Sequence, residues 1–334
     1  MPDWKPLDGL PAEAKARLRK TTQPSWIAPM LATLTEERFS REGWLFEPKL
    51  DGERCLVFRN GRDLRLCSRN RKRLDEKYPE ITMAFHRQEI DSFIADGEIV
   101  AFKDGVTSFA KLQQRMQVEH PPAELLRTVP VWLYLFDLLY LDRYDTRQVS
   151  LQYRKELLRN TFDFRDSLRF TKHRETEGEA YYGEACRRGW EGVIAKNADS
   201  VYVSRRTRDW LKFKCVQEQE FVIGGYTDPQ GKRIGFGALL VGFYRGGRLV
   251  YAGKVGTGFD TETLQRLGSK LAQLERTTSP FAGDGLPRRS VHWLKPKLVA
   301  QIGFTEWTSG DKLRHPRFLG LREDKRPQEI VREG

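Results

Sequence analysis

A lysine set among acidic residues offers the first candidate for chemistry in this sequence. Residues 47–54 read EPKLDGER, so Lys49 lies between Glu47 and Asp51 and is followed by Arg54. A lysine side chain is a nucleophile only when its amine is neutral, a state that a dry site or neighbouring cations favour by lowering its pKa. A solitary KxDG is more often a solvated turn with weak ion pairs. The hypothesis that Lys49 is a nucleophile therefore depends on cations from elsewhere in the chain.

The segment WLKFK at residues 210–214 supplies such cations. Lys212 and Lys214 are two residues apart on a predicted strand, so both ammonium groups leave the same face while Leu211 and Phe213 fill the other. This pattern suits a phosphate clamp with an apolar anchor, although an edge strand with solvated lysines has the same pattern. Lys212 and Lys214 are candidates for neutralising a phosphate.

The segment EGVIAK at residues 191–196 offers a carboxylate for a metal. Glu191 is the ligand type that a hard cation such as Mg²⁺ takes, usually as one or two carboxylates with substrate phosphates. Strict alternation along a strand places Glu191 and Lys196 on opposite faces. The two share a pocket only if Glu191 precedes the strand or a bulge intervenes, and the sequence leaves that choice open.

Three further features are weaker when each is taken alone. Glu98, in ADGEIVAF, lies where the chain enters a strand and can accept hydrogen bonds from a ribose, although an isolated acid there is usually a turn residue. Phe136, in an apolar run, can stack on a purine, although such an aromatic is usually core. Near the C-terminus, residues 313–325 group cations around Phe318 and Leu321, an arrangement that can hold a polyphosphate.

The elements that must position these residues are mainly short strands. Dipeptides at 60–61 (NG), 104–105 (DG) and 246–247 (GG) predict two-residue hairpin turns, because both turn positions need positive φ. The apolar run 131–141 predicts a buried strand. Helices are predicted at residues 77–88, 108–116, 150–162, 177–190 and 261–275. The sequence thus predicts an α+β fold built on antiparallel sheet.

The pattern changes after residue 216. Residues 1–216 carry the motifs, with an irregular lead-in over 1–27. Residues 217–334 contain about five short strands and one helix, which suits a small Greek-key barrel such as an OB-fold. A β-sandwich fits the same pattern, so the choice between these architectures stays open on pattern alone.

Composition narrows the class of partner and the compartment. Lys and Arg outnumber Asp and Glu by 58 to 46, a net charge of +12 that favours an acidic partner such as nucleic acid over a merely solubilising charge. The four cysteines show no CxxC spacing, so we expect no zinc site and a reducing cytoplasm. The N-terminus lacks signal-peptide features and no apolar run is long enough to span a bilayer, so we expect a soluble protein with no membrane partner.

Seven segments, taken together and in order, resemble the covalent nucleotidyltransferases, and most closely the bacterial ATP-dependent DNA ligases of the end-joining type, over the chain from about residue 29 to residue 325. They are KLDGER, CSRNR, DGEIVAF, LFDLLYLD, EGVIAK, WLKFK and RHPRFLGLREDK. One KxDG is unspecific, whereas seven ordered motifs are very specific. The resemblance implies an antiparallel-sheet adenylation domain over 1–216 followed by an OB-fold β-barrel domain over 217–334.

The resemblance also implies roles for individual residues. Lys49 would attack the α-phosphorus of ATP and carry AMP, with Lys212 and Lys214 neutralising the α-phosphate and Glu191 binding Mg²⁺ or Mn²⁺. The implied ATP contacts are Glu47 to the adenine edge, Arg54 and Glu98 to the ribose, Arg69 to the phosphates, Phe136 stacked on the base, Lys196, and Arg322, Asp324 and Lys325 at the leaving pyrophosphate. Within KLDGER, we assign Gly52 to close approach of the ligand, Asp51 to the turn and Glu53 to solvent.

The implied substrate is duplex DNA with a 5′-phosphate nick or end, sealed after AMP passes to that phosphate. Candidate DNA backbone contacts are Arg59, Arg71, Lys72, Arg73 and Lys254. We expect a monomer in the cytoplasm, associated with the nucleoid, with bacterial end-joining or repair proteins as further partners. The chain has no room for the polymerase and nuclease modules of larger end-joining proteins, which leaves the repair pathway open. The alternatives are an RNA ligase, a capping-type guanylyltransferase and a non-catalytic DNA-binding relative.

Overall fold

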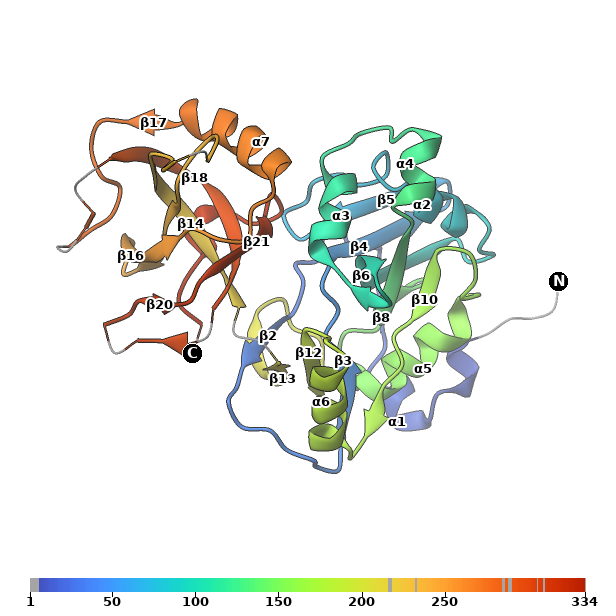
Figure 1. Ribbon diagram of the computed structural model, residues 1–334. Helices are drawn as coiled ribbons and strands as arrows, with labels where there is room; N and C mark the ends of the chain where they lie inside the picture. Colours follow the sequence, from blue (N-terminus) through green and yellow to red (C-terminus); the bar gives the residue numbers. More distant parts are fainter. Residues whose placement is uncertain are drawn as a thin grey trace. The chain divides into compact units, whose positions relative to one another are not determined.

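The chain forms two compact units, Met1–Cys215 and Val216–Gly334, each with its own hydrophobic core. Figure 1 shows the computed structural model. It describes residues 6–215, 218–231, 233–283, 286–287, 290–304, 306–308 and 310–333.

The larger sheet of the first unit has eight strands. Their order is β1 (Arg19–Lys20), β9 (Tyr144–Asp145), β8 (Val131–Leu141), β6 (Ser92–Lys103), β4 (Glu53–Asn60) and β5 (Asp63–Ser68), with β10 (Leu168–Phe170) on β8 and β7 (Val106–Thr107) on β6. One face is covered by α2 (Pro79–His86), α3 (Phe109–Met116), α4 (Ala123–Thr128) and α5 (Leu151–Thr161), whose apolar residues join the main core (Figure 1). All pairings except that of β10 are antiparallel.

The smaller sheet of this unit has five strands. Their order is β11 (Arg174–Glu175), β3 (Trp44–Pro48), β12 (Gly192–Asn197), β13 (Arg206–Lys214) and β2 (Leu31–Leu34). Helix α6 (Gly178–Arg187) packs on one face, where Tyr181 and Ala185 join Phe46, Leu211 and Phe213 in a separate core. The opposite face of this sheet is therefore available for polar residues. The short elements η1 (Pro6–Gly9) and α1 (Ala12–Lys15) precede both sheets.

The second unit is a strongly bent sheet with one α-helix among its described residues. The sheet order is β16 (Arg248–Val255), β15 (Leu239–Arg245), β14 (Glu218–Thr227), β18 (Val291–Gly303) and β17 (Glu275–Arg276), with β21 (Arg317–Leu321) on β18. The helix is α7 (Thr261–Ala272), capped by Asp260, and the minor elements are β19 (Glu306–Trp307), β20 (Leu313–Arg314) and η2 (Pro327–Glu329). Register shifts in β14 and β15 bend the sheet towards a half-barrel, as the OB-fold prediction requires.

Most predicted elements form, with corrections at their ends. Strand β8 has the predicted bounds, and the two turns at 104–105 and 246–247 have positive φ at both residues. The turn predicted at 60–61 lies one residue later, because Asn60 stays in the ladder opposite Asp63 and only Gly61 takes a positive φ. The sequence analysis did not predict α4, a helix of six residues. None of the helices in the described ranges has the length and apolar character needed to traverse a bilayer.

Candidate active site

Lys49 lies in the loop that leads from β3 of the smaller sheet to β4 of the larger one. Its backbone N–H donates to the carbonyl oxygen of Gly192 at 2.9 Å, and its ammonium group forms an ion pair with the Glu191 carboxylate. Both side chains are largely buried, at 17% and 9% exposure. Strand β12 begins at Gly192, so Glu191 precedes the strand, which is the first of the two arrangements left open by the sequence. The candidate nucleophile and the candidate metal ligand are therefore neighbours.

The other residues of the KLDGER loop shape its backbone. Asp51 accepts a hydrogen bond from the N–H of Phe109 at 2.8 Å, at the first residue of α3. A Cβ on Gly52 would lie 2.1 Å from the carbonyl oxygen of Ile99, so the neighbouring strand β6 by itself requires glycine here. The assignment of Glu53 to solvent is wrong, because this side chain is 4% exposed and accepts a hydrogen bond from the Tyr78 hydroxyl at 2.8 Å.

One face of the smaller sheet collects the candidate cations. In the ladder, Ile194 of β12 lies opposite both Glu47 of β3 and Lys212 of β13, so all three share a face. Lys196 and Lys214 are each two residues along from a member of this set and point the same way. Phe213 is in the core on the other side, as the WLKFK spacing predicts.

Glu47 is the centre of a buried charge cluster. It is 2% exposed, and each carboxylate oxygen meets a different lysine: Lys155 at 2.5 Å and Lys196 at 2.6 Å. Burial alone would raise the pKa of Glu47, but the two ammonium groups outweigh it and hold that pKa below its ordinary value. Burial also lowers the pKa of Lys196 to about 8, with Glu47 opposing the shift and Lys155 adding to it. The sequence analysis did not find Lys155, which is 108 residues from Glu47.

An aromatic surface adjoins this cluster. The Nζ atom of Lys196 lies 4.2 Å from the ring centroid of Phe136 and 4.1 Å from that of Trp210. Arg54 also approaches Phe136, with 4.6 Å from Cζ to the ring centroid. Phe136 and Trp210 meet edge to face at 6.0 Å. The fold thus brings Phe136, the candidate stacking residue, close to Arg54, the candidate ribose contact, and to Lys196, which pairs with Glu47.

Arg54 is held by an acid that the sequence analysis did not single out. Its guanidinium donates two hydrogen bonds of 2.6 Å to Asp96, and the Tyr202 hydroxyl donates to the same carboxylate. Burial would lower the pKa of Arg54, but Asp96 raises it above its ordinary value. Glu98 lies opposite Arg54 in the β4–β6 ladder. The DGE motif carried a signal for Asp96. This residue is two positions before Glu98, and residues two apart on a strand share a face.

The candidate DNA contacts divide into two groups. Arg59 is 9% exposed and its guanidinium donates to the carbonyls of Phe85 and Gln88 at the end of α2, so a DNA contact does not fit its geometry. The other four are exposed: Arg71, Lys72 and Arg73 on the turn after β5, and Lys254 on β16. That turn is closed by hydrogen bonds from Arg71 N–H to Ser68 O and from Ser68 N–H to Lys72 O, both 2.9 Å.

The remaining nucleotide candidates belong to the segment after β5 and to the second unit. Arg69 is half-buried just after β5. Arg322, Asp324 and Lys325 belong to the second unit, where Asp324 accepts two hydrogen bonds from Arg322 and Lys325 pairs with Glu220 at 3.0 Å. Burial would raise the pKa of Asp324, but Arg322 lowers it below its ordinary value.

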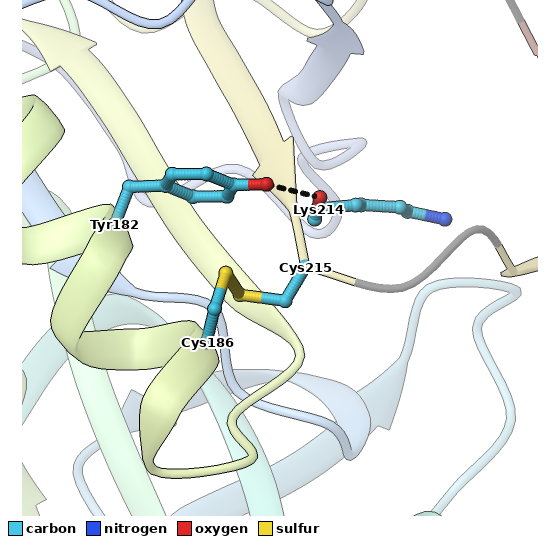
Figure 2. The surroundings of a disulfide bond; sticks show 4 residues. All are labelled: Tyr182, Cys186, Lys214 and Cys215. Atoms are coloured by element: carbon cyan, nitrogen blue, oxygen red, sulfur yellow. Dashed lines mark hydrogen bonds between the residues drawn. A yellow bond between two sulfur atoms is a disulfide. The ribbon is translucent and has the colours of Figure 1, made fainter.

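A disulfide joins Cys186 at the end of α6 to Cys215 just beyond β13 (Figure 2). This bond was not predicted from the sequence, because the two cysteines are 29 residues apart and have no spacing signal. The Tyr182 hydroxyl donates to the carbonyl oxygen of Lys214 at 3.1 Å. The Lys214 side chain points away from the Tyr182 ring and from the disulfide (Figure 2). Cys55 and Cys67 are free and buried, and burial raises the pKa of each thiol.

The donor set fits a cation bound mainly by a substrate. Among the described residues, no cluster of three or more His, Cys, Asp or Glu side chains could form a protein cage for a metal. Glu191 provides one carboxylate beside Lys49. Mg²⁺ commonly uses one or two carboxylates together with phosphate oxygens and waters, so this arrangement suits it.

The two-sheet unit, with its lysine loop and a cationic sheet face beside an aromatic platform, is that of a nucleotidyltransferase. Residues 29–214 match the family model of the ATP dependent DNA ligase domain, and residues 232–325 match that of the ATP dependent DNA ligase C terminal region. The chain belongs to the ATP-dependent DNA ligase family.

Individual relatives agree with this assignment. The chain is 37% identical over 322 residues to the multifunctional non-homologous end joining protein LigD of Pseudomonas aeruginosa, which covers 94% of this chain and 37% of that protein. It is 32% identical over 302 residues to a DNA ligase of Thermococcus onnurineus, and the match covers 85% of this chain and 52% of that protein. It thus spans 52% or less of the length of either protein. The solved structure of a mycobacterial DNA ligase D complexed with ATP and MES covers 92% of this chain and 98% of its own, with 35% identity and a TM-score of 0.65.

Proposed function

We propose that this protein seals nicks or breaks in duplex DNA through a lysyl-AMP intermediate on Lys49, as an ATP-dependent DNA ligase. The observation that carries the proposal is the ion pair of Lys49 with Glu191, at the end of a sheet face that also presents Lys212 and Lys214. Family membership favours this function over an RNA ligase, a capping-type guanylyltransferase or a non-catalytic DNA-binding relative.

The first step is nucleotidyl transfer to the protein. The neutral amine of Lys49 attacks the α-phosphorus of ATP, a nitrogen–phosphorus bond forms, and the bond from that phosphorus to the bridging oxygen breaks. Pyrophosphate leaves with the bonding electrons, and the amine releases a proton. Lys212 and Lys214 stabilise the negative charge that develops on the α-phosphate oxygens. Residues 1–216 would be the adenylation domain and 217–334 the OB-fold domain.

The next two steps seal the DNA. An oxygen of the 5′-phosphate at the break attacks the phosphorus of lysyl-AMP, and the amine of Lys49 leaves and regains a proton. The 3′-hydroxyl then attacks the activated 5′-phosphate, forms the phosphodiester and expels AMP. Each step exchanges one bond at phosphorus for another, so no oxidant or reductant is required.

The clustered residues support a set of proposed nucleotide contacts. Glu47 and Lys196 read the adenine edge, Phe136 stacks on the base, and Arg54 and Glu98 hold the ribose. The phosphates are contacted by Arg69, and Arg322, Asp324 and Lys325 orient the leaving pyrophosphate. Glu191 would hold a Mg²⁺ or Mn²⁺ ion, which supplies charge neutralisation at the phosphates.

The exposed cations indicate the DNA contacts. Arg71, Lys72, Arg73 and Lys254 bind the phosphate backbone of duplex DNA carrying a 5′-phosphate nick or end. We further propose that the protein acts as a monomer in the cytoplasm, associated with the nucleoid, alongside end-joining or repair proteins.

The test is covalent labelling of the protein by α-labelled ATP in the presence of Mg²⁺. Wild type should take up label from ATP in preference to GTP, and Lys49→Ala should reduce labelling to background because the attacking amine is gone. Lys103→Ala, which removes an exposed lysine at a hairpin turn, is the matched control and should label normally. A wild type without label, or a Lys49→Ala variant that labels like the control, contradicts the proposal. Sealing of a nicked DNA duplex beside a nicked RNA duplex then separates DNA ligase from RNA ligase.

A further inference from the structure

Lys155 lies where a helix of the larger core reaches the smaller sheet. Helix α5 contributes Leu157 and Leu158 to the main core, whereas Leu151 packs with Leu45 of β3. Lys155 is one helical turn beyond Leu151, on the same face of α5. Glu47 is two residues beyond Leu45, on the same face of β3. The packing of α5 on β3 therefore delivers the Lys155 ammonium group to the Glu47 carboxylate.

The Lys155 ammonium group is directed at the protein scaffold. The side chain is 2% exposed, and Nζ donates to Oε1 of Glu47 at 2.5 Å and to the carbonyl oxygen of Thr171 at 3.0 Å. The same atom lies 4.8 Å from the ring centroid of Phe170. These contacts fix Lys155 against the last residue of β10 and the residue that follows it. The other oxygen of Glu47 pairs with Lys196, whose ammonium group lies close to the Phe136 ring.

The two lysines thus differ in what they can do for a bound base. Lys196 lies over the rings of Phe136 and Trp210, next to the place where a purine would stack. Lys155 pairs with the Glu47 oxygen that does not meet Lys196, and against the effect of burial the two ammonium groups together lower the pKa of this carboxyl, which favours its ionised form. An ionised carboxylate only accepts hydrogen bonds, whereas a protonated one also donates. Adenine presents an amino group at position 6, which needs an acceptor, and guanine presents a carbonyl, which needs a donor.

We propose that Lys155 is a positioning residue that orients Glu47 as a hydrogen-bond acceptor for the 6-amino group of adenine, and so contributes to the choice of ATP over GTP. The proposal rests on the proposed ligase function, because it concerns the nucleotide of the first step. Lys155 acts through Glu47 and touches neither the base nor the reacting phosphorus.

The experiment compares covalent labelling by α-labelled ATP and α-labelled GTP over a range of nucleotide concentrations. Lys155→Met should raise the KM for ATP, change the maximal labelling rate little, and lower the ATP-to-GTP preference about tenfold, the scale of one hydrogen bond to a charged group. Lys172→Met, an exposed lysine beside Thr171, is the matched control and should keep the wild-type preference. Equal loss of ATP and GTP labelling in Lys155→Met would show a merely structural role and overturn the proposal.

A double-mutant cycle covers the case in which Lys155→Met fails to fold. Glu47→Gln and Glu47→Gln with Lys155→Met both lack the carboxylate through which Lys155 is proposed to act, so comparing them isolates any effect of Lys155 that does not pass through Glu47. If Lys155 acts through Glu47, the two proteins will have the same ATP-to-GTP preference, and a further fall in the double variant overturns the proposal. A wild type that takes no label at all rejects the ligase function itself, whereas a labelled wild type with unchanged preference in Lys155→Met rejects only the role of Lys155.

Discussion

At the scale of single residues, the ion pair of Lys49 and Glu191 joins the proposed nucleophile to the proposed metal ligand, and the proposed first step requires the two to separate. A protonated amine held by a carboxylate cannot attack phosphorus, because its lone pair is occupied by the proton. If Glu191 turns to a cation that arrives with ATP, the charge that stabilises the ammonium form is withdrawn. In the proposed mechanism the pair would hold Lys49 in place before the nucleotide binds, and Glu191 would release it on holding a cation.

This arrangement predicts the behaviour of Glu191→Ala. Labelling by α-labelled ATP should fall about tenfold or more at low Mg²⁺ and recover in part as Mg²⁺ is raised, since one ligand of the cation is lost. The measurement is the initial labelling rate against Mg²⁺ concentration. Glu179→Ala, which removes an exposed acid on α6, serves as the control and should follow the wild-type curve. A Glu191→Ala curve that coincides with the wild type would rule out a metal role.

Residue types and their local spacing predicted part of this site. The other part depends on contacts between segments that are far apart in the sequence. Lys212 and Lys214 were placed on one face because strand alternation is a local rule. The contact of Lys155 with Glu47 depends on how α5 packs on β3, a relation between segments 108 residues apart that no local pattern carries. Arg59 lies in a basic run, but its long side chain found acceptors at the end of α2.

At the scale of elements, most strands and turns with strong local signals formed where the sequence placed them, although the turn predicted at 60–61 lies one residue later. The run 131–141 is a strand from end to end because all of its residues except Asp137 are apolar or aromatic, as is usual in a sheet buried on both faces. Helix ends were less accurate: α2 begins at Pro79, whose ring favours the first turn, and not at Lys77. The pairing of Cys186 with Cys215 follows from α6 packing on the smaller sheet, so it was invisible before that packing was known.

The disulfide predicts a stability that depends on reductant. It ties the end of α6 to the residue after β13, and the N–H of Cys215 donates to the carbonyl oxygen of Glu191 at 3.0 Å. Reduction should cost about 2 to 4 kcal/mol and lower the melting temperature of the first unit by roughly 10 °C. Thermal unfolding with and without dithiothreitol measures this shift.

Cys186→Ser provides the control for the disulfide, because its melting temperature should not respond to dithiothreitol. Thiol titration of the denatured wild type without reductant should find the two free cysteines, Cys55 and Cys67. Four reactive thiols in that titration would mean that the bond does not form.

At the scale of the whole molecule, a net charge of +12 matters through where the exposed cations are placed. The turn after β5 presents Arg71, Lys72 and Arg73 to solvent. Arg73 forms an ion pair with Asp75, with 2.6 Å between Nε and Oδ2. We therefore predict that Arg71→Glu with Lys72→Glu weakens binding to a nicked duplex and reduces the slope of log affinity against log salt by about two.

Fluorescence anisotropy at several salt concentrations gives that slope. The same charge change at Arg17 and Lys20, which are exposed near the N-terminus, controls for net charge and should affect the slope less. Equal effects of the two double variants would contradict the prediction. They would mean that the turn contributes to DNA binding only through the net charge of the protein.

The division into two units predicts that the three chemical steps depend differently on the second one. Arg322 belongs to that unit, where Asp324 holds its guanidinium with hydrogen bonds of 2.9 and 2.8 Å and so presets its direction. Pyrophosphate exists only in the first step, and DNA that already carries AMP on its 5′-phosphate has passed it. If Arg322 orients pyrophosphate, Arg322→Ala should slow lysyl-AMP formation about a hundredfold, as the loss of a charge-assisted contact to a leaving group does, while sealing of pre-adenylated nicked DNA changes little.

Single-turnover rates of the two reactions, measured on one preparation, separate these outcomes. Arg326→Ala, an exposed arginine four residues away, is the matched control and should leave both rates near wild type. An equal loss in both reactions would instead assign Arg322 to DNA binding or to folding of the second unit, because only those roles serve every step alike. Since Asp324 fixes the Arg322 guanidinium, Asp324→Asn should also slow lysyl-AMP formation more than sealing of pre-adenylated DNA, with a smaller effect than Arg322→Ala. A direct contact of Arg322 with DNA would not produce this difference between the two reactions.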